Sequence, residues 1–552
     1  MKKNILLSIF LAFAMFCGAQ VSVWDGTAEP WTNGSGTAED PYLIENAQHL
    51  AYLAQQVNAP NTHNPYGYNL FEQTYFALTT DLDLGGSNGL LWTPIGKNDF
   101  DHGIVSWFCG YFDGDNHTVY NMHIEIPDKR NTAFGLFGMA RNGSIKNIIL
   151  ASNCDVDIEY GILTLETSVF VGGILGEGSA MVLENCVSRA SVTVDVEYVY
   201  HSLYCGGLFG VANMGSDIIN CHNSGIVYGR GKAFYATLAI AGIVSATNEC
   251  NVYGCTNCGD ITGVKSEFGQ LQGCFATGGI VGVACGECHV EQCCNTGKLI
   301  AEDEFGQYDA PASCGGIVGS TYTFLNTTNV LIKNCYNVAA INALSSVTDD
   351  NGNYAGGIFG ATFGYWDETA QHNISIENCY AAGTITADSI GGILAQYGDI
   401  ENYKLPVVSN SYYVNTIESV NKYGESLSAD YMKSEEFVNV LNADGTVFMM
   451  DVNNENNGYP VFVDRDPLDV EENAVTSEVS IYPNPAKDHV RIMLSDKSYC
   501  HSAEIYSVDG RLVKSQVSRC ETMDVSSLNS GVYVITLRMA DGSQISKRLV
   551  IE

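Results

Sequence analysis

The chain has 552 residues, and its 26 Lys and Arg residues against 62 Asp and Glu residues give a net charge of −36. A surface this acidic repels nucleic acid and anionic membranes, so we expect neither as a partner. Charged residues make up only 16% of the chain and glycines number 57, a composition that favours a loop-rich all-β protein with a solvated exterior.

Residues 1–19 predict a secretory signal peptide. Lys2 and Lys3 precede an apolar run that ends at Phe16, and cleavage after Ala19 leaves Gln20 first. Lipidation of Cys17 is disfavoured, because Phe16 stands where a lipobox needs a small side chain. The rest of the chain has no apolar run near the ~18–20 residues that span a bilayer, so we expect export without a transmembrane segment.

Residues 20–69 predict an N-terminal cap with a short helix. One helical face is formed by Ala47, Leu50, Ala51, Ala54 and Val57. Such a cap covers the open end of a repeat array. For Trp24 and Trp31 we favour packing in this cap over stacking on carbohydrate.

Between residues 70 and 420 a unit of ~37 residues recurs. The second glycine of a Gly-Gly step (once Ala-Gly) falls at Gly173, Gly207, Gly242, Gly279, Gly316, Gly357 and Gly392. The separations are 34, 35, 37, 37, 41 and 35 residues. A period of this length indicates a repeat architecture.

Four positions recur within each unit. A cysteine column is predicted at Cys186, Cys221, Cys255, Cys293, Cys335 and Cys379. The preceding residue is predicted to turn a corner, with an Asn ladder at Asn147, Asn185, Asn220, Asn334, Asn378 and Asn410. Apolar residues stand three positions before the cysteine, and a further inward column six positions after it starts at Cys154 and continues at Val192.

The units predict an all-β fold, a right-handed parallel β-helix of eight coils with three brief strands per coil. Inward residues separated by three positions require a bend, because same-side residues on a strand are separated by even numbers. A β-sandwich array and a propeller are the alternatives. A propeller blade needs four antiparallel strands, so we favour the β-helix.

Three phrases before the regular units allow a comparison with a known family. They are Asp81-Leu82-Asp83-Leu84, Trp92-Thr93-Pro94-Ile95-Gly96 and Phe112-Asp113-Gly114-Asp115-Asn116-His117-Thr118-Val119. With the Gly-Gly units, residues 21–465 resemble the GLUG-repeat surface proteins of Bacteroidetes-type bacteria. The resemblance implies a repeat fold and a surface location, and it carries no catalytic residues.

The repeats end in a predicted closure over residues 421–465, with a helix from Ser428 to Asn442. Residues 466–477 form an acidic linker.

Residues 478–552 change to longer alternating strands and predict a small β-sandwich. The phrases Tyr482-Pro483-Asn484-Pro485, Asp509-Gly510-Arg511 and Gly531-Val532-Tyr533 occur in order before a basic terminal strand. This segment is similar to the C-terminal sorting domain of type IX secretion cargo. The resemblance implies that the type IX machinery carries the chain across the outer membrane. The cargo is then released or attached at the cell surface.

The chain has 19 cysteines, which raises the question of metal or disulfide chemistry. Two CxxC steps, Cys255–Cys258 and Cys285–Cys288, suggest zinc, but the place of Cys255 in the column favours packing as a small hydrophobe. Disulfides remain an alternative, for Cys500 with Cys520 and among presumed loop cysteines. The presumed loop cysteines are Cys250, Cys274, Cys285 and Cys288.

We predict no catalytic residue, no metal and no cofactor. The acid pairs Asp81 with Asp83 and Asp113 with Asp115 are assigned to turns or strands. The stretch 451–455 lacks the glycine and terminal Glu of a calcium loop.

Two functions stay open. The first is adhesin-like binding of a glycan or host protein, with aromatic stretches 196–200 and 363–366 as contact candidates. The second is a carbohydrate-active enzyme, either a lyase or a hydrolase, which requires two or three carboxylates converging in a groove. We favour binding.

Overall fold

In the computed structural model the chain forms two compact units, Met1–Val463 and Asp464–Glu552. In the first unit the structure describes residues 21–59, 68–99, 104–125, 131–163, 168–199, 201–233, 237–266, 274–304, 312–321, 328–345, 352–362, 372–395 and 405–463. In the second it describes residues 479–482, 486–487, 489–494, 500–507, 512–517, 522–528, 531–539 and 544–551. The predicted signal peptide and the predicted linker lie outside the described residues.

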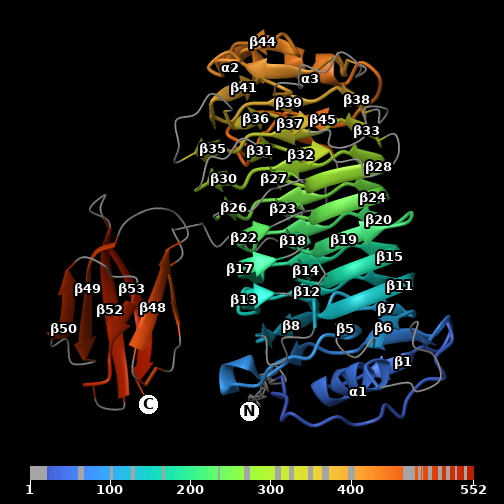
Figure 1. The fold of residues 1–552 in the computed structure, drawn as a ribbon, viewed down its shortest axis with the longest axis vertical. Helices are drawn as coiled ribbons and strands as arrows, with labels where there is room; N and C mark the ends of the chain where they lie inside the picture. The colour runs from blue at the N-terminus through green and yellow to red at the C-terminus, as the bar shows by residue number, and fades with distance from the viewer. Residues whose placement is uncertain are drawn as a thin grey trace, which may run out of the picture. The chain divides into compact units, whose positions relative to one another are not determined.

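The first unit is a parallel β-helix (Figure 1). A complete coil contributes one segment to each of four sheets, which we number 1 to 4 in chain order. Sheets 1, 3 and 4 are entirely parallel, and sheet 2 has one antiparallel pair, between β5 (Lys97–Asp99) and β6 (Ile104–Phe108). The sequence predicted three strands per coil. The fourth, in sheet 1, was missed because it is only two to four residues long and in most coils ends at glycine, which leaves no clear alternation.

Sheet 1 consists of β10 (Ala133–Phe134), β14 (Val169–Gly172), β18 (Leu203–Gly206), β23 (Leu238–Ala241), β27 (Phe275–Gly278), β31 (Ala312–Gly315), β36 (Tyr354–Gly356) and β41 (Ser389–Gly391). Sheet 2 consists of β5 and β6 with β1 (Tyr42–Ile44), β2 (Tyr68–Leu70), β3 (Tyr75–Leu78), β7 (Tyr111–Asp113), β11 (Phe137–Lys146), β15 (Leu175–Glu184), β19 (Phe209–Asn213), β20 (Asp217–Ile219), β24 (Val244–Tyr253), β28 (Val281–Glu291), β32 (Val318–Thr321), β33 (Thr328–Lys333), β37 (Phe359–Thr362), β38 (His372–Glu377) and β42 (Val407–Ser409).

Sheet 3 consists of β4 (Leu82–Asp83), β8 (Thr118–Tyr120), β12 (Ile149–Leu150), β16 (Val187–Ser188), β21 (His222–Asn223), β25 (Thr256–Asn257), β29 (Cys294–Asn295), β34 (Tyr336–Asn337), β39 (Tyr380–Ala381), β43 (Tyr412–Val414) and β44 (Glu425–Leu427). Sheet 4 consists of β9 (His123–Ile124), β13 (Asp155–Leu163), β17 (Ser191–Val199), β22 (Val227–Ala233), β26 (Ile261–Lys265), β30 (Leu299–Asp303), β35 (Ile341–Ser345) and β40 (Ile385–Thr386).

The strand register places similar residues of successive coils next to one another. In sheet 2, Phe112, Ile145, Leu183 and Ile218 pair in succession and are all buried in one core. Burying each such side chain contributes about 1.5–3 kcal/mol. The predicted column through Cys154 is wrong at its first position: Val156, not Cys154, pairs with Val192. The turn after β12 is two residues longer than the turn after β16, which shifts the frame.

The N-terminal end is covered by α1 (Ala47–Val57), which packs its apolar face on the same core. Asn46 caps this helix by accepting a hydrogen bond from the His49 amide. Trp31 makes ring contacts with Tyr42, Tyr52, Phe71 and Phe76 at 4.9 to 5.9 Å. A 3-10 turn, η1 (Gly86–Asn88), follows β4.

At the other end the predicted single helix is two helices, α2 (Ala429–Met432) and α3 (Glu435–Leu441). Ser434 accepts from the Phe437 amide and caps α3, which breaks the continuous pattern. The segment then returns along the outer face of sheet 3, where Phe462 of β46 (Val461–Phe462) lies 5.0 Å from the Tyr336 ring. β46 pairs with β45 (Phe448–Met449).

A second ladder of asparagines, missed from the sequence, runs inside sheet 3. Its fully buried members are Asn223, Asn257, Asn295 and Asn337. Each of the first three amides donates to the side-chain oxygen of the next, at 2.7 or 2.8 Å, and to a backbone oxygen two residues on, at 2.9 Å. The second glycine of the Gly-Gly step makes room, since a Cβ on Gly242 would lie 2.3 Å from Asn257 Cγ.

The second unit is a β-sandwich around its own core. One sheet contains β47 (Val479–Tyr482), β48 (His489–Leu494) and β51 (Thr522–Asp524). The other contains β50 (Leu512–Val517), β49 (Cys500–Ser507), β52 (Gly531–Met539) and β53 (Gln544–Ile551). All of its strand pairs within these sheets are antiparallel.

We call the parallel β-helix of the first unit the rod. Removing one asparagine of the inner ladder should lower the stability of the rod. Asn295→Ala leaves the Asn337 oxygen and one Asn257 proton without their partners in a water-free interior, at a cost of about 2–4 kcal/mol. Denaturant unfolding of the full chain checks this. The matched control is Asn251→Ala, which removes an exposed 2.8 Å hydrogen bond to Asp217 and should cost less than about 0.5 kcal/mol. Equal losses for both variants would contradict the ladder's role.

Extending the ladder should stabilise the rod. Ala381 continues the column after Asn337, Gly383 follows two residues later, and Gly357 leaves the space above it. The amide of an Ala381→Asn variant can donate to Gly383 O while its oxygen accepts from Asn337, a gain of about 1 kcal/mol. The unfolding midpoint should rise, whereas the neighbouring Ala382→Asn variant should not raise it. A lower midpoint for Ala381→Asn would refute the pattern.

Candidate functional site

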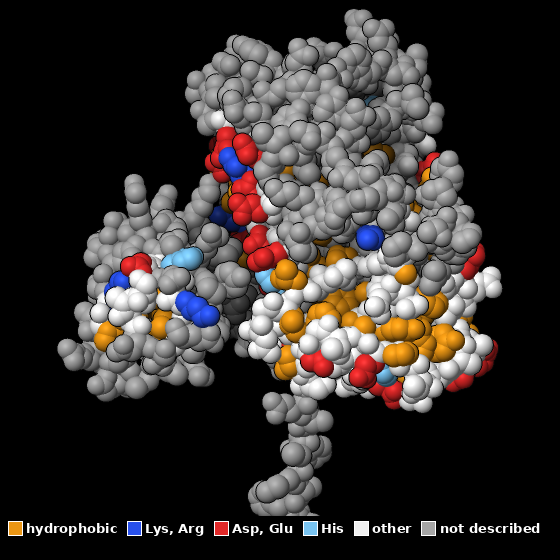
Figure 2. Space-filling view, turned by 60° about the horizontal axis from the view of Figure 1, so that its bottom comes forward, with side chains coloured by type: hydrophobic (Ala, Val, Ile, Leu, Met, Phe, Trp, Pro, Cys, Tyr) orange, Lys and Arg blue, Asp and Glu red, His pale blue; other side chains and the backbone are white. Residues whose placement is uncertain are grey.

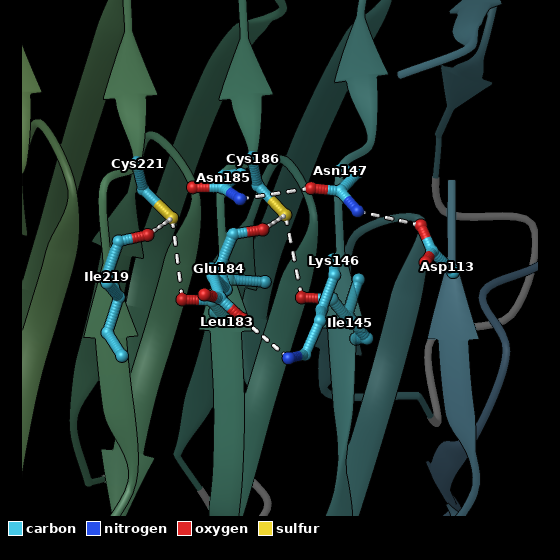
Figure 3. A network of polar contacts seen from close by, with 10 residues as sticks. All are labelled: Asp113, Ile145, Lys146, Asn147, Leu183, Glu184, Asn185, Cys186, Ile219 and Cys221. Atoms are coloured by element: carbon cyan, nitrogen blue, oxygen red, sulfur yellow. Dashed lines mark hydrogen bonds and ion pairs between the residues drawn. The ribbon is translucent and has the colours of Figure 1, made fainter. Parts of the chain in front are cut away.

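The predicted corner asparagines lie where the chain turns from sheet 2 to sheet 3. All six have positive φ values, between 45° and 54°. Asn185 Nδ2 donates to Asn147 Oδ1 at 3.1 Å, and Asn147 Nδ2 donates to Asp113 Oδ1 at 2.8 Å (Figure 3). Asn378 Nδ2 donates to Asn334 Oδ1 at 2.7 Å. These side chains hold the corner and one another.

The six predicted column cysteines are buried at the start of sheet 3. Cys221 Sγ lies 3.3 Å from Ile219 O and 3.6 Å from Leu183 O of the preceding coil (Figure 3). Further along, the Cys255 amide donates to Cys293 Sγ at 3.4 Å. Burial raises the pKa of the Cys221 and Cys293 thiols well above the usual value. Because the thiolate is the nucleophile and the metal ligand, these thiols are chemically inert while buried.

The cysteines predicted to lie in loops are in strands or next to one. Cys250 lies in β24, Cys285 and Cys288 lie in β28, and Cys274 directly precedes β27. The loop prediction was wrong for Cys250 and Cys288 because β24 and β28 are 10 and 11 residues long and carry these two residues into the core. Of these four, Cys250, Cys274 and Cys288 are buried free thiols. Cys500 lies in β49, and Cys520 lies outside the described residues.

The CxxC steps do not assemble a metal centre in the described part of the chain, which has no group of three or more His, Cys, Asp or Glu residues with suitable spacing. Cys255 is buried in the core, whereas Cys258 Sγ lies 3.6 Å from His222 Nε2 on the outer side.

The carboxylates of the acid pairs considered in the sequence analysis accept hydrogen bonds from nearby parts of the chain. Asp83 accepts from the Gly85 amide and from Asn121 Nδ2, both at 2.9 Å. Asp81 accepts from the Thr118 amide at 2.9 Å, and Asp113 accepts from the Asp115 amide at 2.9 Å. Asp451 likewise accepts from three backbone amides at 2.8 Å, those of Glu455, Asn456 and Gly458.

Aromatic side chains gather on the outer face of the first coils of sheet 2. Tyr75 and Tyr111 pair in register and stack with centroids 4.5 Å apart and planes 16° apart. On the same sheet the Arg141 guanidinium lies 5.3 Å from the Trp107 ring centroid. We call Tyr75, Trp107, Tyr111 and Arg141 the aromatic face. Partial exposure of the two tyrosines leaves ring surface available for contact.

The sequence pointed to other aromatic residues. Of the stretch 196–200, Val196 is buried in β17 and Tyr200 lies outside the described residues, as does the stretch 363–366. The missed signal was the spacing of Tyr75-Phe76 and Tyr111-Phe112, one coil apart with the same inward and outward order.

A second aromatic pair lies between sheets 1 and 2. The Phe170 and Tyr204 rings stack at 5.7 Å with an interplanar angle of 3° and pack against the apolar cluster that contains Val211. Glu177 of β15 pairs with Val211, and burial raises the pKa of its carboxyl to about 7. One general acid is thus available near neutral pH.

Acidic side chains recur along one side of the rod (Figure 2). In the first coils His123 lies between two of them. It contacts Asp155 through Nδ1 and Glu125 through Nε2, the latter at 3.1 Å. The hydrogen bond to Asp155 is the main cause that raises the pKa of His123 to about 9, with burial opposing it.

Comparison with known proteins identifies the second unit. Residues 480–552 match the model of the secretion system C-terminal sorting domain. The chain carries a type IX sorting domain. Its presence indicates export by type IX secretion to the cell surface or outside the cell. Among the described residues no helix is long and apolar enough to cross a membrane.

The rod is similar to parts of longer proteins. Over 149 residues it is 30% identical to a protein of Evansella cellulosilytica described as a Gly-rich membrane protein, covering 26% of this chain and 14% of the relative. Over 146 residues it is 32% identical to halomucin of Haloquadratum walsbyi, covering 24% of this chain and 1% of the relative. A solved IgA1 protease superposes with a TM-score of 0.37 at 14% identity, covering 70% of this chain and 23% of that one.

The chain therefore spans less than a quarter of each of these proteins. The expected sorting domain is confirmed by the family match. The resemblance of the rod to GLUG-repeat proteins stays a prediction.

The His123 contacts should make the rod's stability depend on pH. Because the folded-state pKa is raised from 6.5 to about 9, the stabilisation is fully present below about pH 6.5 and is lost as pH rises through 9. Thermal unfolding should show a difference between wild type and His123→Gln that shrinks over this range. Asp155→Asn should remove the same pH dependence. A difference that stays constant up to pH ~10 would contradict this assignment.

Proposed function

We propose that the exported rod is a noncatalytic, adhesin-like protein that binds glycans through its aromatic face. The observation that carries the proposal is the stacked pair Tyr75 and Tyr111 on the outside of a parallel sheet. Ring faces are apolar, as are the C–H faces of sugar rings, so flat contact with a sugar removes apolar surface from water.

The sheet holds these rings in place before any ligand arrives. Both tyrosines are fixed by strand register, and their neighbours Phe76 and Phe112 are buried at 1% exposure. A preorganised face loses little conformational entropy on binding, which favours affinity. A protein ligand that presents planar or apolar groups is the alternative for the same face.

A carbohydrate-active enzyme is the second candidate function, and Glu177 is the observation that favours it. Its carboxyl has a pKa of about 7 and its strand adjoins the Phe170–Tyr204 stack. Glycoside hydrolysis by the usual route needs a second carboxyl group within 5 to 10 Å or so of the first. The acids proposed from the sequence are engaged in turns instead, so binding is better supported.

A glycan and host-protein array probed with the purified full chain tests the proposal. We expect retention of a set of glycans, and loss of about tenfold or more in affinity for them in a Tyr75→Ala/Tyr111→Ala variant, since each stack contributes about 0.5–1.5 kcal/mol. The measurement is titration of a retained glycan by calorimetry.

The matched control is Tyr253→Ala, on the same sheet and 41% exposed but distant along the chain. Unchanged affinity in the double variant, or equal loss in the control, would reject the aromatic face. Release of reducing ends from array polysaccharides, abolished by Glu177→Gln, would instead favour the enzyme.

A further inference from the structure

Lys265 and Asp303 form an ion pair inside the rod. Lys265 ends β26, Asp303 ends β30, and the two residues pair in register on neighbouring strands of sheet 4. Lys265 Nζ is in direct contact with Asp303 Oδ2, and their side chains are 1% and 3% exposed. Both stand four residues after a fully buried inward residue, Ile261 and Leu299, so both point into the interior.

The neighbouring coil leaves room for the lysine. Gly231 of β22 pairs with Lys265 and carries no side chain, whereas Val196 stands at the same position one coil earlier. On the other side Ser345 follows Asp303 in the column. The pair therefore lies next to a position without a side chain, Gly231, and parallel strands hold it in one arrangement.

Burying two charges in such a place is costly, because the mutual attraction of the ions has to offset the loss of hydration of both. Joining the two groups as a neutral amide removes both charges from the water-free interior. The register of the two strands holds the reacting atoms next to each other before the bond forms.

We propose that Lys265 and Asp303 form an intramolecular amide that covalently joins two successive coils. In this step one ammonium proton passes to a carboxylate oxygen of Asp303, the Lys265 Nζ lone pair attacks Asp303 Cγ, and a C–N bond forms. The Cγ–OH bond breaks, a proton from the nitrogen joins the departing hydroxyl, and one water molecule leaves. Ammonium plus carboxylate thus gives amide plus water, and no oxidant, reductant or cofactor takes part.

The chain contains its own control. Lys146 Nζ and Glu184 Oε2 lie 2.5 Å apart on neighbouring strands of sheet 2, but their side chains are 38% and 30% exposed. Both pairs share the contact and the parallel register. In the exposed pair water stabilises the charges, so it stays an ion pair.

Mass spectrometry of the purified, reduced full chain tests the proposal. We expect an intact mass lower than that of the unlinked polypeptide by one water molecule. After denaturation, trypsin should fail to cleave at Lys265, and tandem spectra should show a branched peptide that joins Lys265 to Asp303. Lys146 and Glu184 should appear in linear peptides.

The variant Lys265→Arg keeps the positive charge but offers no amine for this bond, so its full mass should return. Linear wild-type peptides that end at Lys265, with the full intact mass, would overturn the proposal whether or not this variant folds. A branched Lys146–Glu184 peptide in the same digest would also overturn it, because burial would then not be the deciding factor.

Discussion

Backbone hydrogen bonds between successive coils set the same position of each repeat about 4.8 Å from its neighbours, and the rest of the rod depends on this register. A polar side chain that points inward can find its partner only in the next coil. Asn223 to Asn337 meet this condition by donating from one amide to the next. The column ends where the side chain changes: the buried hydroxyl of Ser188, which pairs with Asn223, has no hydrogen-bond partner.

The register between coils also separates the residues that hold the fold together from the residues that can contact a ligand. Stacked thiols and amides satisfy one another inside, and turn carboxylates such as Asp83 are occupied by backbone amides, so neither set is available to a substrate. Residues able to meet a ligand have to stand on the outer faces, where alternate strand positions are free of the core. Tyr75 and Tyr111 occupy such positions in register, which is why repetition along the chain places two stacked rings on the outer face.

The sequence was most informative where one residue type serves one geometry. Asn at the corners predicted the left-handed conformation, and the regular period predicted parallel stacking, because both follow from local sterics and spacing. Prediction from the sequence failed where the length of a turn or the contacts of a residue decide the structure. A two-residue longer turn moved the column from Cys154 to Val156, and Ser434 split a helix that the apolar pattern continued. The Cys-x-Asn-x-Gly spacing at Cys221 and Cys255 did contain the inner ladder, but a buried Asn was not expected without its partners in view. The aromatic face was missed because the first coils are irregular in length, although the spacing of Tyr75-Phe76 and Tyr111-Phe112 contained it.

Because the protein is exported, the register between coils also decides whether its thiols are protected from oxidation. A protein that leaves the cell passes through oxidising surroundings, where exposed thiols form disulfides. Thiol exchange requires a thiolate and an open approach to the sulfur. The stacked coils deny both: Cys221, Cys255 and Cys293 are at most 1% exposed, and burial raises the pKa of Cys221 and Cys293 well above its usual value. The buried thiol column therefore stays protected from exchange outside the cell only while the coils stay closed. A covalent tie between β26 and β30 would act on the same opening motion, because separating those two coils is the step that exposes the thiols on either side.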